Sequence, residues 1–157
     1  MSRNVSATFK QAMFAQETSE AFLPLITLEH DDLDSPIRVV HNHTEITSNG
    51  NTFLPYAFQL MLPDDTERNV CQGKLTIDNV SREIIEAIRS ISSAPTVTIQ
   101  IVLASDPDTV EIEYSDFKLK EITYDAEWVS GNLVIETFSK EPFPGDSFTP
   151  GNFPGLF

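Results

Sequence analysis

The chain has 157 residues, of which 40% are hydrophobic and 22% are charged, a composition typical of one globular domain and not of a disordered chain. Ten Lys and Arg residues stand against 24 Asp and Glu residues, and a net charge of −14 argues against nucleic-acid binding because phosphate backbones would be repelled. No run reaches the roughly 18 apolar residues of a membrane span, and the N-terminus lacks the apolar core of a signal peptide. Cys71 is the single cysteine, so we expect no internal disulfide and a chain that folds in a cytoplasm.

The first predicted element is a helix over residues 6–16. Val5, Phe9, Ala12 and Met13 recur there at helical spacing. The apolar stripe is narrow, so we expect the helix to lie against another surface rather than inside a core.

From Phe22 onward the apolar pattern is mostly that of strands. Leu23 and Leu25 share one face of the first strand with Thr27, and Pro24 favours an edge position because it cannot donate to a ladder. The segments predicted to be extended are 22–30, 37–47, 52–62 with an interruption at Pro55, 74–80, 96–104, 110–114, 117–129 and 133–138.

The faces of the later strands follow from alternation. The side chains predicted to point inward are Leu75, Ile77, Val97, Ile99, Ile101, Leu103, Val110, Ile112, Tyr114, Phe117 and Leu119. After Leu119 the apolar phase shifts to Ile122 and Tyr124, which predicts a β-bulge near Glu121.

Turn signals separate these strands. The segment SNGN (48–51) is a strong hairpin signal because Asn-Gly supplies positive φ values, and SDPDT (105–109) and SGN (130–132) are also predicted turns. Strands joined mostly by hairpins pair antiparallel, so the predicted fold is mainly β, a β-sandwich or an open barrel.

One helix is inserted between strands, over residues 81–91. Val80, Ile84, Ile88 and Ile91 share a face, and either Asn79 or Ser81 is suited to cap its N-terminus. Asp78 and Asn79 therefore form a direct corner between a strand and this helix.

Two groups of residues suggest chemistry without establishing it. His41 and His43 share a strand face and could bind a metal with His30, Asp31 and Asp32, yet no Cys pair or His-x-x-x-His spacing supports such a site. Cys71 could act as a nucleophile with one of these histidines as base, but its sequence surroundings are not electropositive. We expect no catalytic residue, no metal and no cofactor.

The C-terminal arm, residues 141–157, is the least ordinary segment. It contains four Phe, four Pro and three Gly residues, and its Phe spacings of five, five and four fit neither a helix nor a strand. The remaining interpretation is an extended arm whose Phe rings enter separate pockets. These pockets lie either on the same protomer or on a neighbour. The candidate interface residues are Phe143, Phe148, Phe153, Pro154, Leu156 and Phe157 in the arm and Val5, Phe9 and Met13 in the first helix. The predicted organisation is thus an N-terminal helix (1–20), a β-rich domain (21–140) and the arm.

Four stretches taken in order resemble a family of small phage tail proteins, DUF1833. They are SNGNTFLPYAFQLMLPDD, KLTIDNVSREIIEAIRS, VLASDPDTVE and EPFPGDSFTPGNFPGLF. The layout is also distantly similar to the N-terminal part of minor tail protein L of lambdoid phages, through Gly50, Phe53, Pro55 and Tyr56, then Asp78 and Asn79, then Phe153, Pro154 and Gly155.

The resemblance implies a structural part of the virion at the tail tip. It implies self-association in a ring, with a trimer favoured over a hexamer, contacts to the distal tail protein, the central fibre protein and the tape measure, and transient passage of DNA without specific binding. Protein L continues into a cysteine-rich cluster-binding domain, whereas this chain has one Cys, so no metal cluster is implied. The alternatives are the sixfold distal tail ring protein, a ligand-binding β-sandwich, and an enzyme that uses His41, His43 and Cys71.

Overall fold

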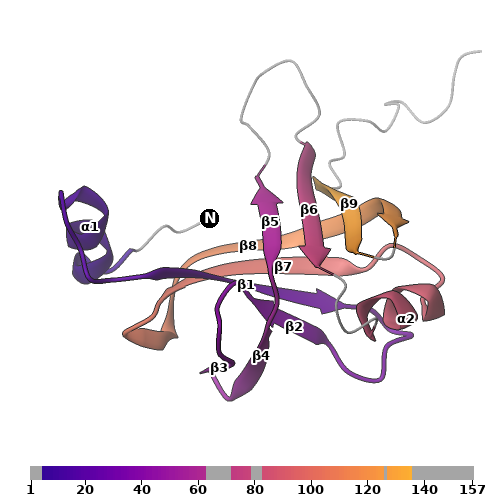
Figure 1. Cartoon of the computed structure of the whole chain (residues 1–157), viewed down its shortest axis with the longest axis horizontal. Coiled ribbons are helices and arrows are strands. Elements are labelled where there is room, and N and C mark those ends of the chain that lie inside the picture. Colours follow the sequence, from indigo (N-terminus) through magenta and orange to yellow (C-terminus); the bar gives the residue numbers. More distant parts are fainter. Residues whose placement is uncertain (1–4, 63–71, 79–82, 126, 136–157) are drawn as a thin grey trace, which may run out of the picture.

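The computed structural model describes residues 5–62, 72–78, 83–125 and 127–135, which form one curled sheet with two helices (Figure 1). The helices are α1 (Ala7–Phe14) and α2 (Glu83–Ser90), and the strands are β1 (Phe22–Glu29), β2 (Ile37–Val40), β3 (Ile46–Ser48), β4 (Asn51–Pro55), β5 (Phe58–Met61), β6 (Gln72–Asp78), β7 (Thr96–Leu103), β8 (Asp106–Tyr124) and β9 (Trp128–Ile135). The mainly β fold class with an N-terminal and an inserted helix is confirmed. Neither of these helices has the length and apolar character needed to cross a membrane.

The sheet is open and strongly curled, and a short link joins two strands near its opposite ends. Its strand order is β3-β4-β2-β1-β7-β8-β9-β6-β5, and its neighbours pair antiparallel except β2 and β4, which are parallel. β4 and β5 lie near opposite ends of this order, yet only Tyr56 and Ala57 separate them in the chain. The Tyr56 N–H donates to the Val40 carbonyl on β2 (3.0 Å), and the Ala57 carbonyl accepts from the Asp78 N–H on β6 (2.8 Å). The sheet therefore forms an open barrel.

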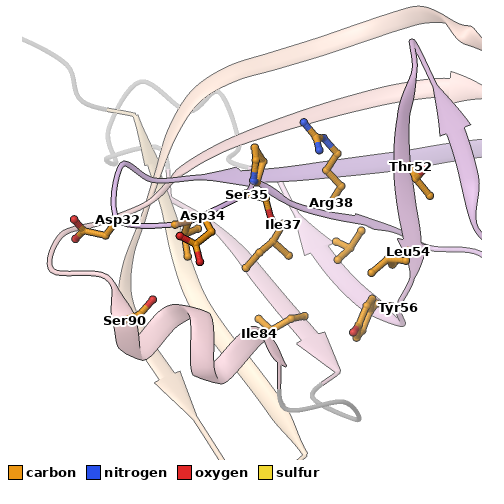
Figure 2. A pocket seen from close by; sticks show the side chains of 13 residues that line it. Asp32, Asp34, Ser35, Ile37, Arg38, Thr52, Leu54, Tyr56, Ile84 and Ser90 are labelled. Carbon is orange, nitrogen blue, oxygen red and sulfur yellow. The ribbon is translucent and has the colours of Figure 1, made fainter.

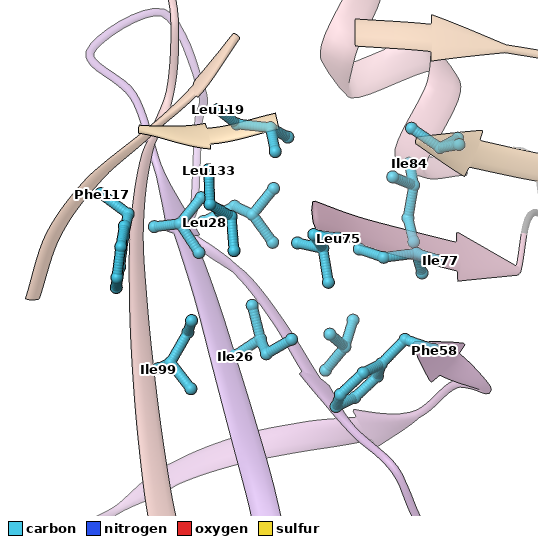
Figure 3. Packing of buried hydrophobic residues seen from close by; sticks show 13 residues of the cluster. Ile26, Leu28, Phe58, Leu75, Ile77, Ile84, Ile99, Phe117, Leu119 and Leu133 are labelled. Atoms are coloured by element: carbon cyan, nitrogen blue, oxygen red, sulfur yellow. The ribbon is translucent and has the colours of Figure 1, made fainter. Parts of the chain in front are cut away.

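The main core fills the inside of this barrel (Figure 3). Every strand of the sheet except β3 and β4 contributes a buried side chain to it, together with Ile84 of α2. The members are Ile26, Leu28, Val39, Phe58, Leu75, Ile77, Ile84, Val97, Ile99, Phe117, Leu119, Val129 and Leu133. The inward positions predicted for Leu75, Ile77, Val97, Ile99, Phe117 and Leu119 are confirmed.

A second, smaller core covers the opposite face of β1. Leu23 and Leu25 pack there with Val40, Phe53 and Val102, so the predicted shared face of Leu23 and Leu25 is confirmed. β1 is buried on both faces, since its Ile26 and Leu28 belong to the main core. Burying both faces explains why this strand reads as a nearly continuous apolar run.

The edge position predicted from Pro24 is wrong for the strand as a whole. β1 lies between β2 and β7 in the sheet. Pairing with β2 begins only at Leu25, whereas Pro24 is opposite Ile101 of β7. Pro24 therefore has a ladder neighbour on one side, and its missing N–H need not interrupt the pairing with β2.

Two local predictions from turn and bulge chemistry are confirmed. Asn49 and Gly50 adopt φ values of 48° and 77° in the β3–β4 hairpin, where Ser48 pairs with Asn51. Glu121 has a φ of 54°, and the register between β8 and β9 shifts between Lys120 and Thr123, as a bulge requires.

The turn predicted at residues 130–132 is wrong, because β9 runs straight through them. The chain reverses earlier, where the Asp125 carboxylate accepts the N–H groups of Glu127 and Trp128, both at 2.8 Å. Gly131 has a packing role instead: a Cβ built there would lie 2.8 Å from Cδ1 of Leu119. The turn predicted at residues 105–109 also lies earlier, at residues 104–105, since β8 begins at Asp106.

The structure describes the inserted helix from Glu83 to Ser90, within the predicted span of residues 81–91, and residues 81–82 lie outside the described residues. It follows β6, which ends at Asp78, and Ile84 is its buried contact to the main core. The predicted capping residues, Asn79 and Ser81, lie outside the described residues.

Candidate interaction surface

Helix α1 lies at one end of the molecule, beyond the ends of the strands that form the main core (Figure 1). It begins after Ser6, whose side-chain oxygen accepts the N–H of Phe9 at 3.0 Å. This bond satisfies one of the free N–H groups of the first turn, which makes Ser6 the N-cap. The helix ends at Phe14, two residues before the predicted end.

A buried carboxylate fastens this helix to the sheet. Glu111 of β8 accepts the backbone N–H of Ser6 at 2.7 Å and the Ser6 hydroxyl at 2.5 Å. Only 6% of Glu111 is exposed. Alternation predicts that its neighbours Val110 and Ile112 point inward, so it predicts that Glu111 itself points to solvent. The carboxylate also lies at the positive end of α1, where negative charge is favoured. We call this contact the Glu111 latch.

The side of α1 that faces the sheet is apolar. Phe9 and Ala12 are buried, and the rings of Phe9 and Phe22 meet edge to face with their centroids 4.9 Å apart. Such an aromatic pair stabilises the contact by about 0.5–1.5 kcal/mol beyond the area it buries. Phe9, a candidate interface residue, therefore packs on its own chain.

The C-terminal end of α1 presents large apolar side chains to solvent. Met13 is 58% exposed and Phe14 is 84% exposed. Met13 is a candidate interface residue, whereas Phe14 was not predicted, because the helical stripe that selects Val5, Phe9 and Met13 does not pass through it. The sequence signal that could have identified Phe14 is its position next to Met13 at the end of the helix. The candidate residues of the C-terminal arm lie outside the described residues.

A cavity of about 470 Å³ lies far from α1, between α2, β4 and the loop before β2 (Figure 2). We call it the α2 cavity. Its apolar wall is formed by Ile37, Leu54, Tyr56 and Ile84, and Leu54 is 44% exposed. Polar groups lie around this wall, namely Asp32, Asp34, Ser35, Arg38, Thr52 and Ser90.

The loop beside the α2 cavity is held by hydrogen bonds to the segment after α2. Asp32 accepts the hydroxyl and the N–H of Ser92, at 2.8 and 3.1 Å. These bonds, the hydroxyl first and then the N–H, lower the pKa of Asp32 and keep its carboxylate ionised. His30 supports the same loop, since its Nδ1 accepts the Asp32 N–H and its Nε2 lies 2.7 Å from the Ser93 hydroxyl.

The histidines considered as metal ligands have structural contacts. His41 Nδ1 accepts the N–H of Phe58 at 3.2 Å, and the two rings meet edge to face. His43 is exposed. Among the residues that the structure describes, no three His, Cys, Asp or Glu side chains are grouped so that they could hold a metal ion. Cys71 lies outside those residues.

Comparison with known proteins places the chain by family. No curated protein matches it. One family model does, over residues 8–148, which include every described strand, α2 and all of α1 except Ala7. The chain therefore belongs to DUF1833, a family described as a domain of unknown function.

Proposed function

We propose that this protein is a structural component of the tail tip of a long-tailed phage. In this role several copies form a ring that links the distal tail ring to the central fibre complex and lines the path by which DNA leaves. The observation that carries the proposal is α1, a helix fastened to one end of the barrel by the Glu111 latch with Met13 and Phe14 exposed. Large apolar side chains presented together on a surface are typical of protein contacts.

The residues on which the resemblance to tail proteins rests have structural positions that fit it. Gly50 forms the β3–β4 hairpin, Phe53 of the next strand is buried, and Pro55 ends that strand. Asp78 ends β6 shortly before α2. These positions fit the hairpin on which the resemblance partly rests.

The net charge fits a surface along which DNA slides. At −14 the chain repels phosphate groups, and bound DNA would slow ejection. The proposed role is mechanical and requires neither catalysis nor a cofactor. It places the protein in the virion, after assembly in the host cytoplasm, with the distal tail protein, the central fibre protein and the tape measure as partners.

Copy number in purified virions tests the proposal. We would count this chain against the major tail-tube protein by quantitative mass spectrometry. About three copies per particle supports the hub, and about six supports the alternative of a sixfold distal ring, because a closed ring fixes the number of its subunits. Absence from virions refutes both.

Deletion of residues 147–157 asks where the C-terminal arm binds. A truncated chain that folds but yields particles without completed tails indicates that the arm contacts a neighbour. A truncated chain that does not fold indicates that the arm belongs to its own core. Circular dichroism of the purified chain and electron microscopy of particles separate these outcomes.

A further inference from the structure

We propose that α1 of one copy docks on the α2 cavity of a second copy, with Phe14 in the cavity and Lys10 facing the aspartates beside it. The inference rests on the self-association in the proposed function and adds the surfaces that make the contact. Three features of the described residues support it: an exposed apolar helix end, a cavity of suitable size, and opposite charge on the two surfaces.

The helix end supplies the apolar group. Phe14 is 84% exposed and adjoins Met13, which is 58% exposed. Burying a phenylalanine removes roughly 150–250 Å² of surface from water. A single exposed apolar residue is ordinary, but a Met-Phe pair at the tip of a helix fixed by a buried carboxylate is a presented surface.

The α2 cavity supplies the receiving surface. Its volume of about 470 Å³ is larger than one aromatic ring requires and is within the roughly 300–1,000 Å³ of pockets that enclose small organic groups. Figure 2 shows Leu54 and Tyr56 on one side of it and Ile84 of α2 below. Because Leu54 is 44% exposed, an entering ring would cover apolar surface that now faces water.

The charges on the two surfaces are opposite. Lys10 is the only charged residue between positions 5 and 16, and it is exposed. The loop at the cavity carries Asp31, Asp32 and Asp34, all exposed, against one lining cation, Arg38 of β2, and the bonds from Ser92 hold the carboxylate of Asp32 in place. In a chain of net charge −14, a helix with one positive and no negative charge is suited to this acidic loop.

The positions of the two surfaces favour docking on a second copy over docking within the same chain. Figure 1 places α1 at one end of the molecule and α2 with the loop before β2 near the other end. The helix therefore cannot reach the cavity of its own chain. Two different surfaces at opposite ends form a head-to-tail contact, which closes into a ring when the rotation between copies permits it.

Cysteine cross-linking tests the contact directly. Two full-length variants, each with Cys71→Ser, carry either Phe14→Cys or Leu54→Cys, and they are mixed under mild oxidation. We expect the mixed disulfide to form at least ~10-fold faster than in a control mixture of Phe14→Cys with Thr109→Cys, because disulfides require Cα atoms within about 7 Å. Thr109 is also exposed but belongs to β8 and does not line the cavity. Equal rates in the two mixtures overturn the proposal.

A charge exchange gives a second readout on the full chain. Lys10→Glu should weaken self-association, measured by sedimentation, by ~2- to 5-fold, as expected for an exposed ion pair. Adding Asp34→Lys should recover it, whereas no recovery contradicts the assigned pairing. A Phe14–Leu54 link that forms only after deletion of residues 147–157 shows that the chain's own arm fills the cavity, and this also overturns the proposal.

The outcomes separate this inference from the proposed function. The chain can be present in virions while Phe14→Cys and Leu54→Cys fail to link, in which case the tail role stands and this contact does not. If the link forms but virions lack the chain, the contact stands and the tail role does not.

Discussion

Removing the Glu111 carboxylate should release α1 while the barrel stays folded. In Glu111→Ala the N–H and the hydroxyl of Ser6 lose their acceptor. Glu111 belongs to neither hydrophobic core, so the loss acts on the helix rather than on the barrel. The expected result is local opening of α1 with little change in the rest of the molecule.

The size of the effect follows from the two bonds. A hydrogen bond to a charged group contributes about 1.5–3 kcal/mol, and the charge at the helix N-terminus adds about 0.3–1 kcal/mol. Both Ser6 groups are only half-buried and regain water when α1 opens, so we take about 2 kcal/mol for the whole contact. At 1.4 kcal/mol per factor of ten, α1 should open roughly 30-fold more often.

Amide hydrogen exchange measures this opening residue by residue. The Lys10 N–H donates to the Ser6 carbonyl at 3.1 Å and reports on the first turn of α1. Its protection should fall roughly 30-fold in Glu111→Ala, while amides of β7 and β9 keep theirs. The matched control is Glu113→Ala on the same strand. It removes an exposed carboxylate that accepts a hydrogen bond from the Gln100 side chain. A change under ~3-fold at Lys10, or equal losses across the barrel, would refute the latch.

Three further predictions concern the barrel. Gly131→Ala should lower the free energy of unfolding by about 1–3 kcal/mol in urea titration, because the new Cβ would meet Leu119 at 2.8 Å; an unchanged midpoint contradicts this packing role. Gly50→Ala should cost about 1–2 kcal/mol in the same assay from its φ of 77° alone, since nothing lies within 4 Å of the added Cβ, and a stabilised variant would disprove that reasoning. Asp125→Ala should lower Tm at neutral pH, because bonds from Trp128 and Glu127 depress the folded-state pKa of Asp125 below 3.8. A carboxylate with a depressed pKa stabilises the fold above pH 3.8, so the difference in Tm between Asp125→Ala and the unmutated protein should shrink as the pH falls below that value. Asp125→Asn keeps a side-chain acceptor and should therefore lower Tm less. A difference in Tm that does not change with pH would exclude the linkage.

Local chemistry made part of this fold predictable. The Asn49-Gly50 turn follows from backbone sterics that few other residue pairs satisfy. The bulge at Glu121 follows from a break in apolar alternation, because one extra residue reverses the face on which every later side chain lies. The inward faces of β6 and β7 near Leu75 and Val97 follow from the same two-residue period.

Contacts between distant parts of the chain were not predictable. Glu111 bonds to a residue 105 positions away, so alternation alone identifies it as an outward acid. Gly131 resembles a turn residue until the side chain of Leu119 is seen beside it. The parallel pairing of β2 with β4 was also missed, because hairpin signals imply only antiparallel neighbours. For the candidate site, sequence located α1 and Met13 but neither Phe14 nor the α2 cavity.

The short link between β4 and β5 has a consequence for folding kinetics. Residues 56 and 57 join strands that lie near opposite ends of the sheet order, so β5 reaches its place only after the strands between them have been laid side by side. Contacts between residues distant in sequence form slowly, because loop entropy is lost before they stabilise the chain. We therefore expect the pairing of β5 with β6 to form after the rate-limiting barrier, and substitutions at Phe58 to accelerate unfolding far more than they slow folding.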